Sequence, residues 1–251
     1  MKRLDGPTQF VITGAERTGT NLLIGLINQY NGCYCGGELF NMAQIVKNLL
    51  PWKDINENDR PTLIALRQVD PVDFWQKLFQ RRRDEGEQAI GFKLLYKHTL
   101  QCKPLVDALE SDHNTRIVHM VRENQLRRYV SERQARAAGK WSYTYKDELV
   151  EMPSVVVSAV DLVKSILDTN QLEREFDKRF ASHPCIKVTY ENLARAPALV
   201  AADVIRFLGL NDAKVQPVTT FRKTGAEDIS QVIQNYDELR SQIAQWASFF
   251  D

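Results

Sequence analysis

The hydrophobic positions of this chain alternate between short continuous runs and longer groups with helical spacing. Four short runs are predicted to be strands: 10–12, Ala89–Leu95, Arg116–Val121 and Cys185–Thr189. Short runs of this kind, rich in Val and Ile, are typical of strands buried on both faces of a sheet.

The segments between these runs carry apolar residues at intervals of three and four, which predicts helices. The predicted helices are 22–27, 39–50, 72–83, 104–110, 124–138, 154–180, 197–208 and a C-terminal helix covering 232–246. Pro51 ends one of them, and Pro197 and Gly209 bracket another. The segment 31–38 is predicted to be a glycine-rich crossover, and 51–71 a polar surface loop with one short helical piece.

Strands that alternate with helices predict an α/β fold, a three-layer sandwich with a central, mainly parallel sheet. No internal repeat, low-complexity tract or linker interrupts the chain. We therefore expect one domain over 1–251, with a helical and loop excursion around 39–85. In such folds ligands bind beyond the carboxyl ends of the strands, so the residues at those ends are the first candidates for a site.

The first strand leads into a loop with two glycines, one arginine and two threonines, GAERTGTN at 14–21. A glycine-containing turn before a helix offers backbone N–H groups and a favourable dipole to a phosphate. The loop has the glycine spacing of a P-loop, G-x-x-x-x-G-K-[ST], but Thr20 replaces the lysine and Asn21 the hydroxyl residue. Its cation is Arg17 instead. A plain strand–helix turn remains the alternative.

The third strand ends at Arg122, where a magnesium-dependent nucleoside triphosphatase usually has an aspartate. Ser131 follows nine residues later on the next predicted helix. A guanidinium and a hydroxyl together suit a second phosphate. Taken singly, Arg122 is better explained by a surface ion pair and Ser131 by a solvent-facing position on the helix. Two predicted phosphate-binding sites, without the residues that usually bind magnesium, favour a nucleotide with phosphates at separate positions.

These residues resemble the sulfotransferases that use 3′-phosphoadenosine 5′-phosphosulfate (PAPS), most of all the bacterial carbohydrate branch with the trehalose and nodulation-factor enzymes. The loop RTGTNLL at 17–23 is similar to the family's R-[ST]-G-[ST]-x-L-L motif. Arg122 and Ser131 match the family's pair for the 3′-phosphate. Further matches in family order are G-E-x-F at 37–40, G-x-K at 91–93, A-x-x-x-G-x-W at 135–141, Y-E-x-L at 190–193, F-L-G-L at 207–210 and N-Y-D-E-L at 235–239.

The resemblance implies an enzyme that moves a sulfuryl group from PAPS to an acceptor hydroxyl on a carbohydrate or glycolipid, leaving PAP and needing no metal. The 5′-phosphosulfate would then be held by five loop residues, Arg17, Thr18, Gly19, Thr20 and Asn21. A late basic turn with Arg222 and Lys223 would close over the 3′-phosphate, although a solvated charge cluster explains it equally well.

The resemblance also places the general base at Glu38, with His98 as the second candidate. In the alternative view, Glu38 only opens the next helix, and a lone histidine is structural. Lys93 would face the sulfuryl group or else pair with a neighbouring acid. Trp141 would stack on adenine or a sugar ring, unless it is an ordinary core or rim tryptophan. Glu16 replaces a proline common in the family, so it must turn away from the anion or pair with a cation.

Charge and composition narrow the remaining choices. With 33 basic and 32 acidic residues the net charge is +1, which argues against a surface that coats nucleic acid. No apolar run approaches the roughly 20 residues of a spanning helix, and the four cysteines form no zinc pattern and suit a reducing cytoplasm. We expect a cytoplasmic, bacterial enzyme, and a homodimer is left open. The alternatives are a divergent P-loop kinase or triphosphatase, and a nucleotide-binding protein of this fold without activity.

Overall fold

The computed structural model describes residues 6–41, 60–148, 151–211, 215–221, 225–226 and 228–244. In this part of the chain a five-stranded sheet forms the centre, with the order β2-β3-β1-β4-β5 and every neighbouring pair parallel. Its strands are β1 (Thr8–Gly14), β2 (Cys33–Gly36), β3 (Ala89–Leu95), β4 (Arg116–Val121) and β5 (Cys185–Thr189). The predicted α/β fold with a parallel sheet is confirmed.

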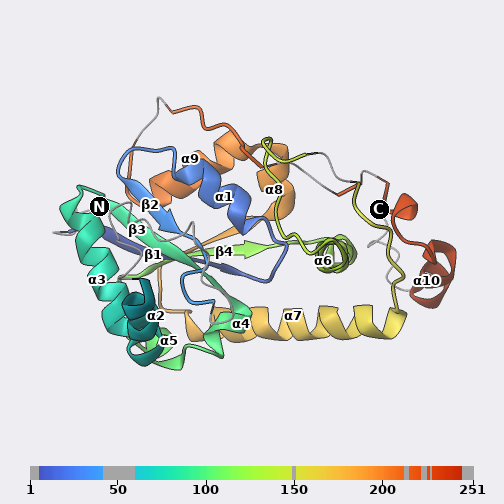
Figure 1. Ribbon diagram of the computed structural model, residues 1–251, viewed down its shortest axis with the longest axis horizontal. Helices are drawn as coiled ribbons and strands as arrows, with labels where there is room; N and C mark the ends of the chain where they lie inside the picture. Colours follow the sequence, from blue (N-terminus) through green and yellow to red (C-terminus); the bar gives the residue numbers. More distant parts are fainter. Residues whose placement is uncertain are drawn as a thin grey trace.

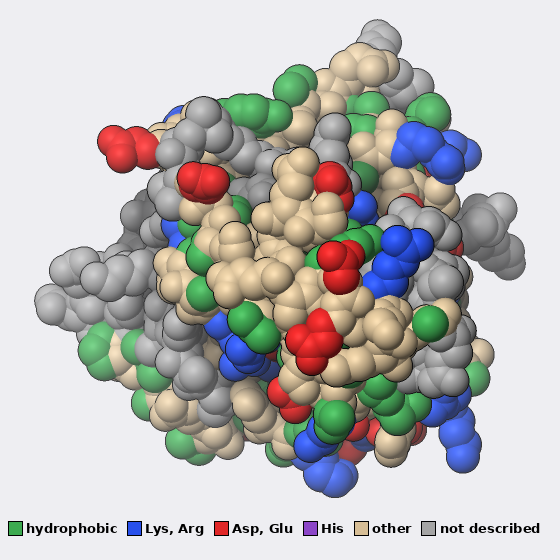
Figure 2. All heavy atoms as spheres, turned by 90° about the vertical axis from the view of Figure 1, so that its right-hand side faces the viewer, with side chains coloured by type: hydrophobic (Ala, Val, Ile, Leu, Met, Phe, Trp, Pro, Cys, Tyr) green, Lys and Arg blue, Asp and Glu red, His purple; other side chains and the backbone are tan. Residues whose placement is uncertain are grey.

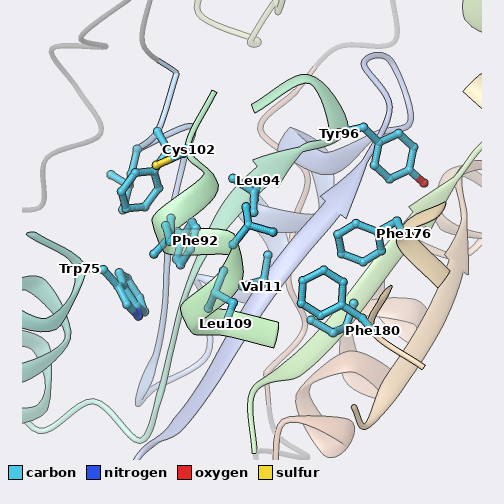
Figure 3. Close-up of a cluster of buried hydrophobic side chains, with 14 of the residues drawn as sticks. Val11, Trp75, Phe92, Leu94, Tyr96, Cys102, Leu109, Phe176 and Phe180 are labelled. Atoms are coloured by element: carbon cyan, nitrogen blue, oxygen red, sulfur yellow. The ribbon is translucent and has the colours of Figure 1, made fainter. Parts of the chain in front are cut away.

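Helices cover both faces of the sheet and complete three layers (Figure 1). One face carries α1 (Thr20–Ile27), α8 (Tyr190–Arg195) and α9 (Pro197–Phe207), and the opposite face α3 (Pro71–Asp84), α5 (Lys103–Ser111) and α7 (Ala159–Arg179). Successive residues of β1 serve the two layers in turn: Phe10 and Ile12 pack towards α1 and α9, whereas Val11 packs towards α3, α5 and α7. Figure 3 shows the second of these cores, where Trp75 and Phe92 lie on one side of Val11 and Phe176 on the other.

The remaining helices lie around this sandwich. They are α2 (Arg60–Val69), α4 (Tyr96–Thr99), α6 (Gln125–Ala138), the 3-10 turn Ile229–Gln231 and α10 (Tyr236–Gln242). Helix α6 follows the carboxyl end of β4 and packs against α7 in a third apolar cluster together with the residues around α10. Gly139 ends α6 in the left-handed conformation (φ 64°), as its sequence position predicts.

Outside the excursion, three predicted segments differ from the structure by more than two residues. The segment 31–38 contains the edge strand β2, which four residues with two cysteines and a glycine do not reveal by pattern. Helix α7 begins at Ala159 instead of 154, because Val155 bridges to Ile233 and Ser158 caps the helix. The 3-10 turn Ile229–Gln231 and the same bridge at Ile233 precede α10, so that the C-terminal helix begins at Tyr236.

Two other predictions concern the excursion. Of the helix predicted over 39–50, Leu39 and Phe40 lie in a turn and 42–50 lies outside the described residues. The short helical piece predicted within 51–71 corresponds to α2. Among the described helices, none has both the length and the apolar character needed to cross a membrane.

Candidate functional site

The loop between β1 and α1 can be built only with glycine at two places. A Cβ on Gly14 would lie 2.4 Å from the carbonyl oxygen of Met120 on the neighbouring strand. Gly19 has a φ of 84°, and a Cβ there would lie 2.8 Å from the ring of Tyr190. Within the loop the Thr18 hydroxyl is buried and donates to the carbonyl of Ala15 at 2.8 Å. The loop is therefore tightly fitted between β4 and α8.

The N-terminus of α1 is open to an anion. Gly19 occupies the N-cap position, so no side chain satisfies the first N–H groups of the helix, and the first turn contains no acid. Thr20 is buried at its first position. Arg17 adopts a left-handed φ of 66°, which is uncommon for a residue with a side chain and here bends the loop around the helix end. Free N–H groups and the helix dipole make this a phosphate site in chemical terms.

Arg17 and Arg122 meet at this loop. Arg122 Nη1 donates to the backbone carbonyl of Arg17 at 3.1 Å, and Arg17 Nε donates to Ser131 Oγ at 2.9 Å. Arg17 Nη1 also donates to the carbonyl of Trp141, just beyond α6. The three residues expected to grip two phosphates therefore share one edge of the sheet.

The Arg122 guanidinium packs on an aromatic ring but keeps one N–H donor without a hydrogen-bond partner among the described residues. Its guanidinium carbon lies 4.2 Å from the centre of the Tyr190 ring, within cation–π range. Its Nε is buried and has no hydrogen-bond partner among the described residues. Burial lowers the pKa of Arg122 to about 10, against the raising effect of Tyr190 and Glu191, so the group is still charged at neutral pH. A buried N–H donor without a partner fits an anionic ligand.

Glu191 explains the acid in the Y-E-x-L motif. Its carboxylate accepts hydrogen bonds from the backbone N–H groups of Glu123 and Asn124, at 3.1 and 3.2 Å. These residues connect Arg122 to α6, where the Asn124 side chain caps the helix by accepting from the N–H of Arg127. Helix α8 thus positions both Arg122 and the helix that carries Ser131.

A second cluster lies at the carboxyl ends of β2 and β3. Lys93 Nζ lies 2.7 Å from Glu38 Oε1 and donates to Asn21 Oδ1 at 2.9 Å, so it joins Glu38 to the phosphate loop. Asn41 Nδ2 donates to Glu38 Oε2 at 2.9 Å. His98 Nε2 lies 3.7 Å from the same oxygen, beyond hydrogen-bond range.

Protonation states follow from these contacts. Burial raises the pKa of Glu38, but the ammonium of Lys93 and the hydrogen bond from Asn41 outweigh it and leave the pKa below the ordinary value. The fully buried His98 ring has its pKa lowered to about 4 by desolvation, although Glu38 opposes this. At neutral pH Glu38 is therefore an ionised carboxylate and His98 a neutral ring. Glu38 lies after β2 and outside any helix, so the helix-opening alternative is wrong.

Glu16 pairs with a cation, one of the two expected outcomes. Its Oε1 lies 2.6 Å from Lys97 Nζ on α4. Burial raises the pKa of the carboxyl, but Lys97 outweighs this and keeps the pKa below its ordinary value. The acid beside the anion loop is thereby neutralised by a partner of its own.

The structure thus brings nearly all predicted site residues to one edge of the sheet. Arg222 and Lys223 lie outside the described residues. Sequence reasoning assigned no role to Asn41 or to the Tyr190 ring; a tyrosine directly after a strand was the available signal for the latter. Within the described ranges, His, Cys, Asp and Glu side chains form no group of three that could hold a metal ion.

Known proteins were compared with the chain. A family model described as "Sulfotransferase family" matches residues 8–214. A search among curated proteins found no match. A sulfotransferase from Alicyclobacillus acidocaldarius superposes with a TM-score of 0.55 at 17% identity, over 98% of this chain and 95% of that one.

Two more distant structures were also found. The sulfotransferase domain of the Synechococcus PCC 7002 olefin synthase gives a TM-score of 0.48 at 16% identity, covering 94% of this chain and 86% of that one. Retinol dehydratase in complex with androsterone and the inactive cofactor PAP gives a TM-score of 0.43 at 11% identity, covering 98% of this chain and 81% of that one. Because the family model spans most of the sequence, this chain belongs to the sulfotransferase family.

Proposed function

We propose that this sulfotransferase takes its sulfuryl group from PAPS and passes it to a hydroxyl of a carbohydrate. One observation carries the donor assignment: the Arg122 side chain donates a hydrogen bond to the backbone carbonyl of Arg17, and the Arg17 side chain donates one to Ser131. The N-terminus of α1 and the Arg122–Ser131 pair are thus neighbouring anion sites joined by one loop. A nucleotide with a phosphosulfate at one end and a separate 3′-phosphate needs such a pair.

In this proposal the first N–H groups of α1, from Gly19 to Asn21, together with Arg17 bind the 5′-phosphosulfate. The unpartnered Nε of Arg122 and the hydroxyl of Ser131 bind the 3′-phosphate. When the 3′-phosphate binds, the Ser131 hydroxyl gives up its hydrogen bond with Arg17 and bonds to the phosphate. The Arg17 side chain is then free to interact with the negative charge of the 5′-phosphosulfate. The Tyr190 ring keeps the Arg122 guanidinium in place.

The transfer forms one bond and breaks another. The acceptor oxygen attacks sulfur, the bond between sulfur and the bridging phosphate oxygen breaks, and its electron pair remains on the 5′-phosphate of PAP. The acceptor proton passes to the carboxylate of Glu38. Arg17 and the α1 N–H groups stabilise the charge that grows on the phosphate, and one such donor typically contributes about 2.7–4 kcal/mol to lowering the barrier.

Glu38 is the better base because it is ionised and partly accessible: its side chain is 22% exposed, whereas that of His98 is fully buried. Lys93 touches both Glu38 and Asn21, so it lies between the base and the phosphate loop. Its ammonium is placed to interact with the sulfuryl oxygens while they pass from donor to acceptor.

The carbohydrate assignment is supported by the G-E-x-F and A-x-x-x-G-x-W motifs, which resemble the carbohydrate branch of the family. Incubation with ³⁵S-labelled PAPS and a panel of sugars, glycolipids and simple alcohols, with and without a chelator, tests the proposal. We expect label on a sugar hydroxyl in both conditions. Hydrolysis of ATP that the chelator abolishes, without label transfer, would instead indicate a P-loop triphosphatase.

A further inference from the structure

A cavity of about 340 Å³ opens beside the phosphate loop, on the α7 side of the sheet. Its inner end is formed by Ala15 and Glu16, directly before Arg17, and by Tyr96 and Lys97 at the end of β3. Its walls are the facing sides of α6 and α7. The volume lies at the lower end of the roughly 300–1,000 Å³ that small-molecule sites occupy.

Glu38, Lys93 and His98, here called the base cluster, do not line the cavity but follow its inner end. Tyr96 and Lys97, which do line it, belong to the four-residue helix α4 that also carries His98. Both Glu16 and Lys97, at its inner end, influence the pKa of Lys93 and of His98 through their charges. The α1 N-terminus lies on the opposite side of the sheet, with the α1 and α9 core. A donor bound at α1 and a molecule in the cavity would thus approach Lys93 and Glu38 from two directions, as an in-line transfer requires.

Charged groups dominate the lining, and their signs nearly balance. Nine of the fifteen lining residues are charged, five basic and four acidic, and Ala15 and Leu172 are the only aliphatic ones. Several charges compensate one another, since Glu132 pairs with both Arg128 and Arg136. Figure 2, which views the molecule from the right-hand side of Figure 1, shows acidic and basic side chains interspersed on that face. Such a lining offers hydrogen bonds to hydroxyl groups but little surface to a sterol or a flat phenol.

Helix α7 presents one polar row to the cavity. Asp161, Lys164 and Asp168 recur at intervals of three and four along it, and all three side chains are exposed. The described residues include no ion-pair partner for Lys164 or Asp168. Opposite them, the buried Arg128 donates to Ser165 Oγ at 2.7 Å and ties the two helices together. The contact between Arg128 and Ser165 therefore fixes the inner surface of the cavity, and the exposed side chains of α7 offer polar groups to a ligand.

Trp141 lies at the edge of this cavity. The lining cations Lys97 and Arg136 each lie 5.9 Å from the centre of its ring, and the residue is 40% exposed. Its backbone carbonyl accepts a hydrogen bond from Arg17. An exposed indole fixed to the donor loop is suited to stacking against the C–H face of a sugar ring.

We propose that the cavity between α6 and α7 is the acceptor site, and that it binds an uncharged, polyhydroxylated sugar. The sugar ring packs on Trp141, and the carboxylates of Asp161 and Asp168 accept hydrogen bonds from its hydroxyls. One hydroxyl then points past Glu16 to the base cluster. This inference rests on the proposed sulfuryl transfer and adds to it the place and the chemistry of the acceptor.

The test separates acceptor binding from donor binding. Glucose, trehalose, N-acetylglucosamine oligomers, 4-nitrophenol and a sterol are offered with labelled PAPS to the wild type and to Trp141→Leu, Trp141→Phe, Asp168→Ala and Glu175→Ala. Glu175 is the matched control, an exposed acid of α7 that does not line the cavity. PAP affinity is measured on every variant by calorimetry, and folding by thermal melts.

We expect label on a sugar and a KM for that sugar about tenfold higher in Trp141→Leu and Asp168→Ala, equivalent to about 1.4 kcal/mol. Trp141→Phe should keep most of the wild-type KM, and Glu175→Ala all of it, with PAP affinity unchanged throughout. Unchanged sugar KM values, or label on 4-nitrophenol or the sterol and on no sugar, would overturn the acceptor site while PAP binding remained intact. If the wild type itself did not bind PAP, the donor assignment would be overturned and this inference with it.

Discussion

Arg122 donates a hydrogen bond at 3.1 Å to the backbone carbonyl of Arg17, a residue held in the left-handed conformation. The contact joins two segments separated by more than a hundred residues and does so through the backbone of one of them. Arg122 therefore supports the shape of the phosphate loop in addition to offering its own charge. Loss of this side chain should affect both ends of the donor.

Arg122→Ala tests that dual role. Hydrogen bonds to charged groups contribute about 1.5–3 kcal/mol each, so we expect the Kd of PAP to rise on the order of 100-fold. Isothermal titration with PAP gives the value. Arg174→Ala, at an exposed arginine of α7, is the control and should bind PAP like the wild type. Equal affinities in the two variants would remove Arg122 from the donor site.

Glu38→Gln separates binding from chemistry. The amide is close in shape but cannot accept a proton, and a positioned base contributes roughly 10²–10⁴-fold to the rate. We expect kcat to fall by that factor with little change in the Kd of PAP. His98→Gln is the comparison. If single-turnover rates fell in His98→Gln and stayed at the wild-type level in Glu38→Gln, the base would be His98.

Lys93→Met should move the pH profile of the enzyme. The Lys93 ammonium is the main group that holds the pKa of Glu38 below its ordinary value. Without it, chiefly the hydrogen bond from Asn41 opposes the raising effect of burial, so the pKa rises. Since a nearby opposite charge shifts a carboxyl by about 1–3 units, we expect the acidic limb of kcat against pH to move upward by at least about one unit.

Lys178→Met is the control for this shift, because Lys178 is an exposed lysine in the last turn of α7 and does not influence the pKa of Glu38. Its acidic limb should stay where the wild type has it. A limb that moves equally in both variants, or in neither, would show that the Glu38 carboxylate does not set the pH dependence of the rate.

The fold followed from the sequence wherever a run was long enough to carry a pattern. Strands β3, β4 and β5 were predicted with their observed bounds, since a short, continuous apolar run between polar segments is typical of a buried strand. Strand β2 was missed because its extended conformation depends on pairing with β3, a contact between segments distant in the sequence. The start of α7 was missed for the same reason, as Val155 is held by Ile233.

The candidate site was predictable in its residues but not in its connections. Motif spacing pointed to Arg17 in the loop and to Arg122 and Ser131 as a separate pair, and no spacing reveals that Arg17 donates to Ser131. Likewise Lys93 was left between two roles, and the structure shows it paired with Glu38 and bonded to Asn21 at once. Such contacts arise from the parallel packing of strands, which places their carboxyl ends side by side.

His98 should make the stability of the protein depend on pH. Its folded pKa of about 4 lies below its ordinary value of 6.5, so between these values the unfolded chain binds more protons. The free energy of unfolding therefore decreases as pH falls from about 6.5 to about 4, by on the order of 3 kcal/mol at about 1.4 kcal/mol per pKa unit.

Urea unfolding at a series of pH values measures this dependence. His98→Gln should show a shallower slope over the same range. Part of the slope should remain, because burial also lowers the pKa of His119. Identical slopes in the variant and the wild type would mean that His98 is not a buried neutral ring.

Gly19→Ala and Gly86→Ala together distinguish backbone strain from a steric contact at the phosphate loop. Both glycines have a left-handed φ, 84° and 91°, but a Cβ on Gly86 meets nothing within 4 Å, whereas one on Gly19 lies 2.8 Å from the Tyr190 ring. The left-handed conformation costs a residue with a Cβ roughly 1–2 kcal/mol, so we expect Gly86→Ala to lose about that much stability in urea unfolding.

Gly19→Ala should lose more stability, and it should also weaken PAP binding, because the displaced Tyr190 ring supports Arg122. Gly86→Ala, at the end of α3, should leave the Kd of PAP unchanged. If Gly19→Ala matched Gly86→Ala in both stability and PAP affinity, Tyr190 would have room to move without consequence. The packing of α8 against the loop could then not be what holds Arg122 in place for the donor.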